Sequence, residues 1–295
     1  MSIYMIFLQL GKAHSKNEIG FRLLAKEANA VLEYEYDSNK IYDLIWIPSG
    51  FVHESQFPNA KKLLYGPHNF VVPTEPWTLK IPFEKSIYTC LSPWVKELYS
   101  NFGELCMPVK TIPFPVDIER FSPNTDEKIL NCFVYFKGRE RKFLNYIQNY
   151  LEDNKISYET ILCGKYKEED YIESLKKAKF GIWIGCHESQ GFALEEALSM
   201  NVPLLVLNVK TLHDEVNNEG NHSYLEYKDK YHLKATTCSY WDSRCGEIIY
   251  ELDELEDGLQ KIQTKSYNPR QFILETLSPK ACYERCISEN IIIHP

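Results

Sequence analysis

The sequence lacks the features that mark membrane proteins and nucleic-acid-binding proteins. Its longest early apolar run, Ile3 to Leu10, is far shorter than the roughly 20 residues that span a bilayer, and it has no basic leader or small-residue cleavage site. Acidic residues outnumber basic ones by 41 to 33, and the formal net charge is −8. Because no overall basic field exists to hold phosphates, we expect no nucleic-acid partner and no transmembrane segment.

Cysteine is present but in no pattern that predicts disulfides or a metal site. The nine cysteines are odd in number and scattered singly. Cys238 with Cys245, and Cys282 with Cys286, lack a second pair at the spacing of zinc ligands. Several of the nine lie in apolar, strand-like runs, where a free cysteine behaves as a small hydrophobic residue. We therefore expect free thiols, a cytoplasmic location and no bound metal.

Strand-like and helix-like segments alternate along the chain, which indicates parallel sheets covered by helices. Between Pro113 and Asn124, three prolines stand among turn-forming residues without periodicity, so the chain is expected to cross between domains there. We predict two Rossmann-like, doubly wound domains, residues 1–122 and 123–295, with ligand bound between them at the carboxyl ends of the strands. The expected strands are 3–10, 42–47, 62–65, 86–91, 109–114, 129–136, 158–163, 180–184 and 202–207, and the expected helices are 17–30, 92–99, 140–151, 168–178, 190–200, 252–263, 269–276 and 279–288.

The most informative stretch is residues 187–200, where a strand-like run leads through a turn containing Gly191 into a helix. The free N–H groups and positive dipole end of such a helix favour an anion. Glu188 in the turn and Glu196 in the helix are better suited to accept hydrogen bonds from hydroxyl groups attached to that anion. A sugar nucleotide offers both chemistries. Helical periodicity places Glu195 and Glu196 on opposite flanks of the apolar stripe and does not choose between them, and acids near a helix start can simply complement its dipole.

Residues 187–203 resemble the Glu-x7-Glu signature of retaining glycosyltransferases of the GT-B fold. Glu188 and Glu196 are in register with the two acids, and Gly191 stands where the signature has its glycine. Three further segments resemble the interdomain passage, a late helix of the first domain and the closing helices of that family; they are residues 111–123, 91–99 and 267–272.

The resemblance implies roles for the residues of this turn and helix. Glu196 would accept hydrogen bonds from the ribose hydroxyls, and Glu188, as a catalytic residue, would contact the transferred sugar. The turn would hold the sugar hydroxyls or the diphosphate, so its binding residues are Ser189, Gln190, Gly191 and Phe192. The family needs no metal for its chemistry, and the resemblance implies no cofactor besides the donor itself.

A second group of candidates follows the first strand of the second half, in residues 136–142. The resembled family places an Arg and a Lys there to neutralise the donor diphosphate, and Arg139 follows a glycine as that motif requires. Lys142 lies closer to Arg139 than the lysine of that motif usually does. Lys137, Arg141 and Lys142 are therefore all candidates for the second cation. The alternative is a solvated basic helix start, which the helix dipole disfavours.

The first half contributes two further candidates. Gly11, after the first strand, would let the backbone approach a phosphate or sugar, although a glycine there can also simply make a turn. His68 follows a strand and resembles a histidine that the family places near the reacting carbon. It could polarise a hydroxyl or stabilise charge, or it could be structural.

Together these features predict a retaining glycosyltransferase that moves a sugar from a UDP- or GDP-sugar to a glycan or another hydroxyl acceptor. Since no second carboxylate is placed as a nucleophile, front-face attack assisted by the leaving diphosphate is expected. One alternative is a catalytically weak nucleotide-sugar-binding subunit, because the first half is short, about 120 residues, and Gln190 stands where the family commonly has an aromatic residue. The other is a nucleotide-sugar epimerase or hydrolase on the same fold.

Overall fold

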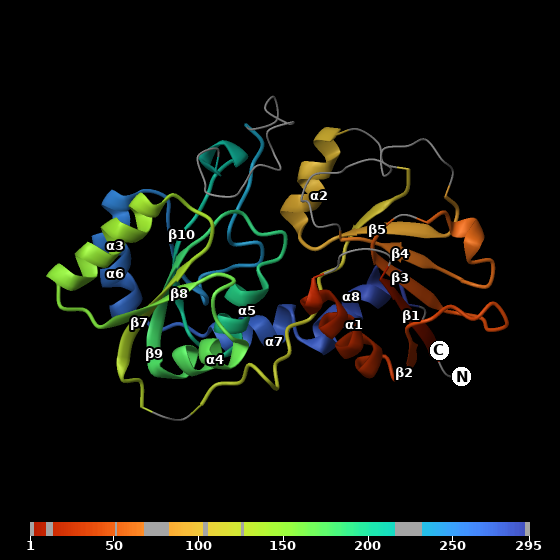
Figure 1. The fold of residues 1–295 in the computed structure, drawn as a ribbon, viewed down its shortest axis with the longest axis horizontal. Coiled ribbons are helices and arrows are strands. Elements are labelled where there is room, and N and C mark those ends of the chain that lie inside the picture. Colours follow the sequence, from red (N-terminus) through yellow and green to blue (C-terminus); the bar gives the residue numbers. More distant parts are fainter. Residues whose placement is uncertain are drawn as a thin grey trace. The chain divides into compact units, whose positions relative to one another are not determined.

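The computed structural model forms two compact units, each an α/β unit built on a parallel sheet (Figure 1). Unit 1 comprises Met1–Asp117 and Glu275–Pro295, and unit 2 comprises Ile118–Leu274. The expectation of two Rossmann-like domains is thereby confirmed. The residues described are 3–9, 14–50, 52–67, 83–102, 106–124, 127–215 and 232–292.

Unit 1 contains a sheet of six parallel strands in the order β2-β1-β3-β4-β5-β6. The order reverses between β1 and β3, since the chain goes first to one side of β1 and then to the other. The strands are β1 (Ile3–Gln9), β2 (Ala30–Glu33), β3 (Leu44–Ser49), β4 (Leu63–Tyr65), β5 (Ser86–Cys90) and β6 (Val109–Thr111), and the helices are α1 (Ser15–Glu27), α2 (Pro93–Tyr99) and α8 (Pro279–Ser288).

Aromatic side chains join the sheet of unit 1 to helix α1. Phe21 of α1 packs against Phe7 of β1 and Trp46 of β3, with ring centroids 5.1 and 5.5 Å apart. Trp46 in turn stacks on Phe114 at 4.4 Å. A Cβ at Gly20 would lie 2.5 Å from the Cβ of Phe114, so the helix carries a glycine where it approaches this ring.

The C-terminal segment returns to unit 1, which differs from the expected division at residue 122. Helix α7 (Pro269–Thr276) leaves unit 2, and α8 then packs on α1. Cys282 and Cys286, one turn apart on α8, are fully buried, and the backbone N–H of Val116 donates to Leu277 O at 2.9 Å. The bounds of α7 and α8 match the expected helices, but the residues from Glu275 onward belong with unit 1 because the apolar face of α8 is buried there.

Unit 2 contains five parallel strands in the order β11-β10-β9-β7-β8. Here too the order reverses, because β8 lies on one side of β7 and β9 on the other. The register aligns Phe136 of β7 with Leu162 of β8 and Ile184 of β9, so the three strands end together. The strands are β7 (Leu130–Phe136), β8 (Tyr158–Leu162), β9 (Ala178–Ile184), β10 (Leu204–Leu207) and β11 (Gly246–Ile249), and the helices are α3 (Arg141–Asp153), α4 (Glu168–Lys177), α5 (Phe192–Ser199) and α6 (Leu255–Thr264).

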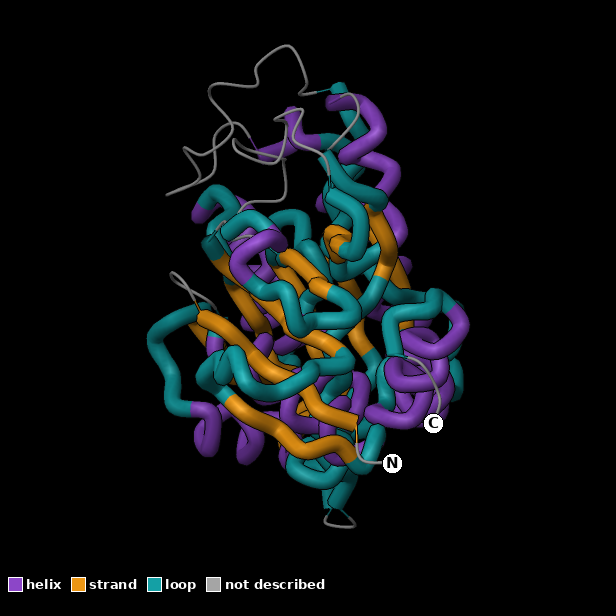
Figure 2. The backbone as a smooth tube through the Cα atoms, turned by 90° about the vertical axis from the view of Figure 1, so that its right-hand side faces the viewer, coloured by secondary structure: helices purple, strands orange, loops and turns teal. Residues whose placement is uncertain are grey.

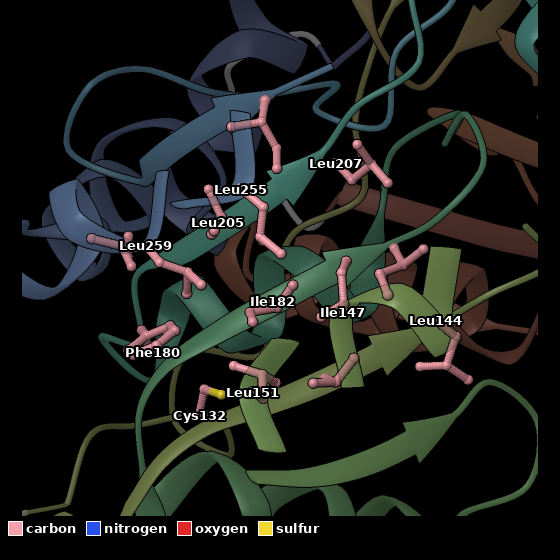
Figure 3. Packing of buried hydrophobic residues seen from close by; sticks show 14 of the residues in the cluster. Cys132, Leu144, Ile147, Leu151, Phe180, Ile182, Leu205, Leu207, Leu255 and Leu259 are labelled. Atoms are coloured by element: carbon pink, nitrogen blue, oxygen red, sulfur yellow. The ribbon is translucent and has the colours of Figure 1, made fainter. Parts of the chain in front are cut away.

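Helices cover both faces of the unit 2 sheet. On one face, α3 and α6 bury apolar side chains such as Ile147 and Leu259 against strand residues such as Ile182 and Leu205 (Figure 3). On the other face, Tyr171 of α4 contacts Tyr135 of β7. This packing on both faces holds the strands in place, and the loops of the candidate site follow the ends of these strands.

Two short strands were not expected from the sequence, β2 and β11. Their burial does not alternate from residue to residue, and β2 is only partly buried, so neither shows the pattern that marks a strand. The strands and helices that were expected are all present, with ends that agree to within a few residues. Figure 2 shows the helices beside the strands. In the part of the chain that the structure describes, no helix is long and apolar enough to cross a membrane.

Candidate functional site

The candidate site of unit 2 lies at the point where the strand order reverses, between β7 and β9. Open parallel sheets bind ligands in the crevice outside the carboxyl ends of the strands at such a point. Two segments meet there: residues 137–140 after β7, called the β7 turn, and residues 185–191 after β9, called the β9 loop. Lys137 N donates to Ile184 O at 2.9 Å, and Cys186 Sγ lies 3.5 Å from Lys137 O.

Gly191 ends the β9 loop and forms the N-cap of α5. Its φ of 99° and ψ of 47° lie in the left-handed region, which explains the glycine. The expected helix at 190–200 therefore begins only at Phe192. Gly191 has no side chain that could cap this end of the helix. The N-terminus of α5 is therefore suited to bind an anion. Ser189 and Phe192 flank the glycine and are partly buried.

Glu188 in the β9 loop forms a bidentate ion pair with Lys137 in the β7 turn. Lys137 Nζ lies 2.6 Å from Oε1 and 2.8 Å from Oε2 of Glu188. The side chain of Glu188 is 12% exposed and that of Lys137 is 38% exposed. Burial lowers the pKa of Lys137, but the charge and hydrogen bonds of Glu188 outweigh it, and the net pKa is raised. The lysine therefore stays protonated at neutral pH.

Arg139 is a buried cation in the β7 turn, with 4% of its surface exposed. Its Nη1 donates to Gly185 O at 3.3 Å, its guanidinium lies 4.7 Å above the ring of Phe143, and its Nε has no partner among the described residues. Burial lowers its pKa, although Glu215 and other nearby groups act in the opposite direction. A buried guanidinium without a carboxylate in contact suits an anion supplied by a ligand.

The other two basic candidates point elsewhere. Lys142 is 64% exposed and pairs with Glu140 at 3.0 Å, and Arg141 lies over the ring of Phe136 at 5.4 Å. Both belong to the first turn of α3. Of the three cations left open by the sequence, Lys137 is the one that reaches Glu188.

The two adjacent glutamates of α5 have different surroundings. Glu195 is fully buried, its Oε2 accepts from Gln190 Nε2 at 2.8 Å, and its Oε1 has no partner among the described residues. Glu196 is 6% exposed and lies close enough to Tyr171 for its charge to help raise the pKa of that tyrosine, after burial. Gln190 is thus turned toward the core, and Glu196 is the acid nearer the surface.

We expect Glu195→Gln to stabilise the protein at pH 8. Burial raises the pKa of Glu195 well above its ordinary value, opposed by the Gln190 hydrogen bond and reinforced by Glu196 and Glu188. A raised folded-state pKa gives stability that is fully present below the unfolded pKa and is lost as pH rises. The neutral amide removes this loss, so the free energy of unfolding at pH 8 should rise by on the order of 1 kcal/mol.

Urea unfolding at pH 5 and pH 8 measures this effect. Glu256→Gln, at an exposed acid of α6, is the matched control and should leave the pH dependence unchanged. Destabilisation of Glu195→Gln at pH 8, with the wild-type pH dependence retained, would mean that Glu195 is ionised in the fold.

Two residues outside the predicted set hold the β9 loop. Glu215 accepts from the backbone N–H of His187 and lies 2.6 Å from His187 Nδ1. Asn208, at the end of β10, is hydrogen bonded to a segment that contacts Glu188. No sequence pattern pointed to either residue, because the contacts join segments 28 or more residues apart.

Two predicted site residues, Gly11 and His68, lie outside the described residues. Among the residues that the structure does describe, no group of three or more His, Cys, Asp or Glu side chains is arranged to hold a metal ion. The expectation of metal-independent chemistry stays a prediction.

Comparison with known proteins assigns the fold. No protein-family model and no curated protein sequence matches the chain. The lipopolysaccharide outer core galactosyltransferase WaaB superposes with a TM-score of 0.56 at 8% identity, over 98% of this chain and 99% of that one. Sucrose-phosphate synthase from Thermosynechococcus elongatus gives 0.55 at 10% identity, over 98% of both chains. The fold is GT-B.

A third similar structure is that of Staphylococcus aureus TarM, at 11% identity and a TM-score of 0.49. The match covers 83% of this chain and 54% of that one, so this chain spans about half the length of TarM. The GT-B assignment depends on the two matches that extend over nearly the whole length of both proteins. At these identities the likeness shows the fold and leaves donor, acceptor and stereochemistry open.

Proposed function

We propose that this GT-B protein is a retaining glycosyltransferase that moves a sugar from a UDP- or GDP-sugar to an acceptor hydroxyl without a bound metal. The observation that carries the proposal is the arrangement of charged side chains where the strand order of unit 2 reverses, between β7 and β9. Two cations, Lys137 and buried Arg139, and the acid Glu188 meet on the loops after β7 and β9, beside the glycine-capped start of α5.

The arrangement suits the electrostatic demands of glycosyl transfer. Negative charge develops on the departing diphosphate, and a cation fixed in advance at that position stabilises it. Arg139 is buried, its Nη1 donates to the Gly185 carbonyl, and its Nε has no partner among the described residues, so a phosphate oxygen could accept the hydrogen bond that this N–H would donate. Lys137 is protonated and partly exposed, and the N-terminus of α5, where no side chain of the N-cap residue makes a capping hydrogen bond, follows the same loop.

The acids have complementary roles in this proposal. Glu188, held by Lys137, would contact the transferred sugar, and Glu196 would accept from the ribose hydroxyls. With Glu188 ion-paired rather than free to attack, retention would proceed by front-face attack, in which the leaving diphosphate assists the incoming hydroxyl.

The proposal also covers the acceptor and the compartment. Two structural neighbours are named as a galactosyltransferase and as sucrose-phosphate synthase, which supports a glycan or another hydroxyl compound as acceptor. All nine cysteines, each within the described residues, are free thiols, which supports a reducing compartment such as the cytoplasm.

Nucleotide binding tests the donor site. We expect UDP or GDP, with its sugar conjugates, to raise the melting temperature, because a ligand at a hundredfold excess over Kd stabilises the native state by about 2.7 kcal/mol. Glu196→Ala should lower the affinity at least about tenfold, the loss of one charge-assisted hydrogen bond, while Glu256→Ala on α6 serves as the control. Unchanged affinity in Glu196→Ala would refute the assignment of this acid, and the absence of any shift in the wild type would refute the donor site.

Product analysis separates transfer from the alternatives. With the nucleotide identified, His68→Ala should lower turnover and leave donor affinity nearly unchanged if transfer occurs. Binding without any product would favour a nucleotide-sugar-binding subunit. Free sugar or an epimer without acceptor product would favour a hydrolase or epimerase.

A further inference from the structure

The backbone of Glu188 is held at both of its polar groups by residues 233–239. Its N–H donates to Thr236 O at 3.0 Å, and Ser239 Oγ donates to its carbonyl oxygen. Hydrogen bonds at both backbone groups fix the position of Cα and the direction of its bond to Cβ. Residues 233–239 therefore set where the side chain of Glu188 begins, and the ion pair with Lys137 holds its carboxylate.

Asn208 fixes the conformation of residues 233–239. It lies directly after β10, it is buried, and its Oδ1 accepts three hydrogen bonds: from Val209 N at 2.9 Å, Thr237 N at 2.7 Å and Thr236 Oγ1 at 3.1 Å. Thr236 Oγ1 in turn accepts from Cys238 N at 3.0 Å. One side-chain oxygen thus joins the rigid end of β10 to the residue whose carbonyl holds Glu188.

The chain after β10 supports the same loop at a second point. Residues 210–212 and 233–235 run together, with Leu212 N donating to Leu233 O at 3.2 Å and Ala235 N to Lys210 O at 3.1 Å. Glu215 follows, is buried, and holds the backbone N–H and ring Nδ1 of His187, the neighbour of Glu188.

We propose that Asn208 and Glu215 are positioning residues that fix Glu188 against the transferred sugar of the bound donor. The inference rests on the proposed function and adds residues that its signature does not contain. Glu215 holds His187 directly, and Asn208 acts on Glu188 through Thr236 and Thr237, so both hydrogen-bond routes lead to residues 187–188. Loss of Asn208 should therefore weaken contacts to the sugar and spare contacts to the nucleotide.

Amide hydrogen exchange of Glu188 tests the positioning without any ligand. Asn208→Leu removes the acceptor oxygen at similar volume, and the Glu188 amide should exchange at least about tenfold faster, since its opening costs less. Asn208→Asp keeps an acceptor oxygen and should restore slow exchange. Gln148→Leu removes an exposed hydrogen bond between α3 and β8 in the same unit, to Thr160 at 3.0 Å, and should leave the Glu188 amide unchanged. Unchanged exchange in Asn208→Leu would overturn the inference.

Affinity for UDP and UDP-glucose, or for GDP and GDP-mannose, tests the consequence. In Asn208→Leu, the affinity for the sugar conjugate should fall at least about fivefold, or about 1 kcal/mol, with affinity for the bare nucleotide unchanged. The charge of Glu215 also acts on Arg139, so this comparison uses Asn208 alone. An equal fall for both ligands would mean a general structural role and overturn the inference. If the wild type binds no nucleotide, the proposed function fails, while faster exchange in Asn208→Leu still supports the hold on Glu188.

Discussion

Replacing Glu188 by Gln should lower the turnover of the transfer reaction by about a hundred- to a thousandfold, the cost of removing one preorganised electrostatic contact to the transition state. The amide keeps the shape of the side chain but removes the charge that, in the proposed reaction, would face the positive charge developing on the transferred sugar. Lys137 then loses its carboxylate partner and becomes available to the diphosphate, so affinity for the bare nucleotide should stay the same or rise. A fall of turnover much larger than any fall of affinity for the sugar conjugate is the expected signature.

Glu173→Gln is the matched control for this experiment. Glu173 also lies in unit 2 and also pairs with a lysine, Lys176 at 2.7 Å, but on the exposed surface of α4. Its substitution should change turnover by less than about twofold, as an exposed ion pair contributes little. Steady-state kinetics with the identified donor measure both variants. An equal loss of turnover and donor affinity in Glu188→Gln would assign the residue to ground-state binding instead.

Local patterns were sufficient for most of the fold. Runs of β-branched and aromatic residues identified nine of the strands, and the terminal helices α7 and α8 have the expected bounds. These patterns do not show which other element each apolar face packs against. The face of α8 that carries Cys282 and Cys286 is buried against unit 1, more than 150 residues away along the chain. Periodicity gives the face and leaves the contact open.

In the candidate site too, local sequence patterns located some residues, and contacts between distant segments were needed for the others. The order strand, turn and helix located Glu188 and Gly191. Choosing Lys137 among the basic residues required the register of β7 with β9, which sets Lys137 beside Ile184 and places Lys142 on α3. Glu195 and Glu196 differ in their surroundings only once α5 is packed. The hydrogen bonds from Glu215 and Asn208 had no local signal at all.

Replacing Arg139 by Met should weaken donor binding while stabilising the ligand-free protein. The guanidinium is 4% exposed, contacts one carbonyl at 3.3 Å and leaves Nε without a partner among the described residues. Substituting apolar residues for buried ionic groups is often neutral or stabilising, by about 1 to 4 kcal/mol. If Arg139 meets the diphosphate as proposed, loss of this cation should cost at least roughly 2 kcal/mol, or about thirtyfold in affinity.

Arg141→Met is the control, since Arg141 is two residues away and also lies over an aromatic ring, that of Phe136, but is exposed. It should change neither donor affinity nor stability by more than about 0.5 kcal/mol. Titration calorimetry with the donor and urea unfolding of the ligand-free protein give the two quantities. Destabilisation of Arg139→Met with unchanged donor affinity would show that Arg139 stabilises the β9 loop and binds no diphosphate. A cation that is buried in order to bind a ligand should give higher stability and lower donor affinity when it is removed. The reason is that its charge stays unpaired in the ligand-free protein and is paired only when the anion binds.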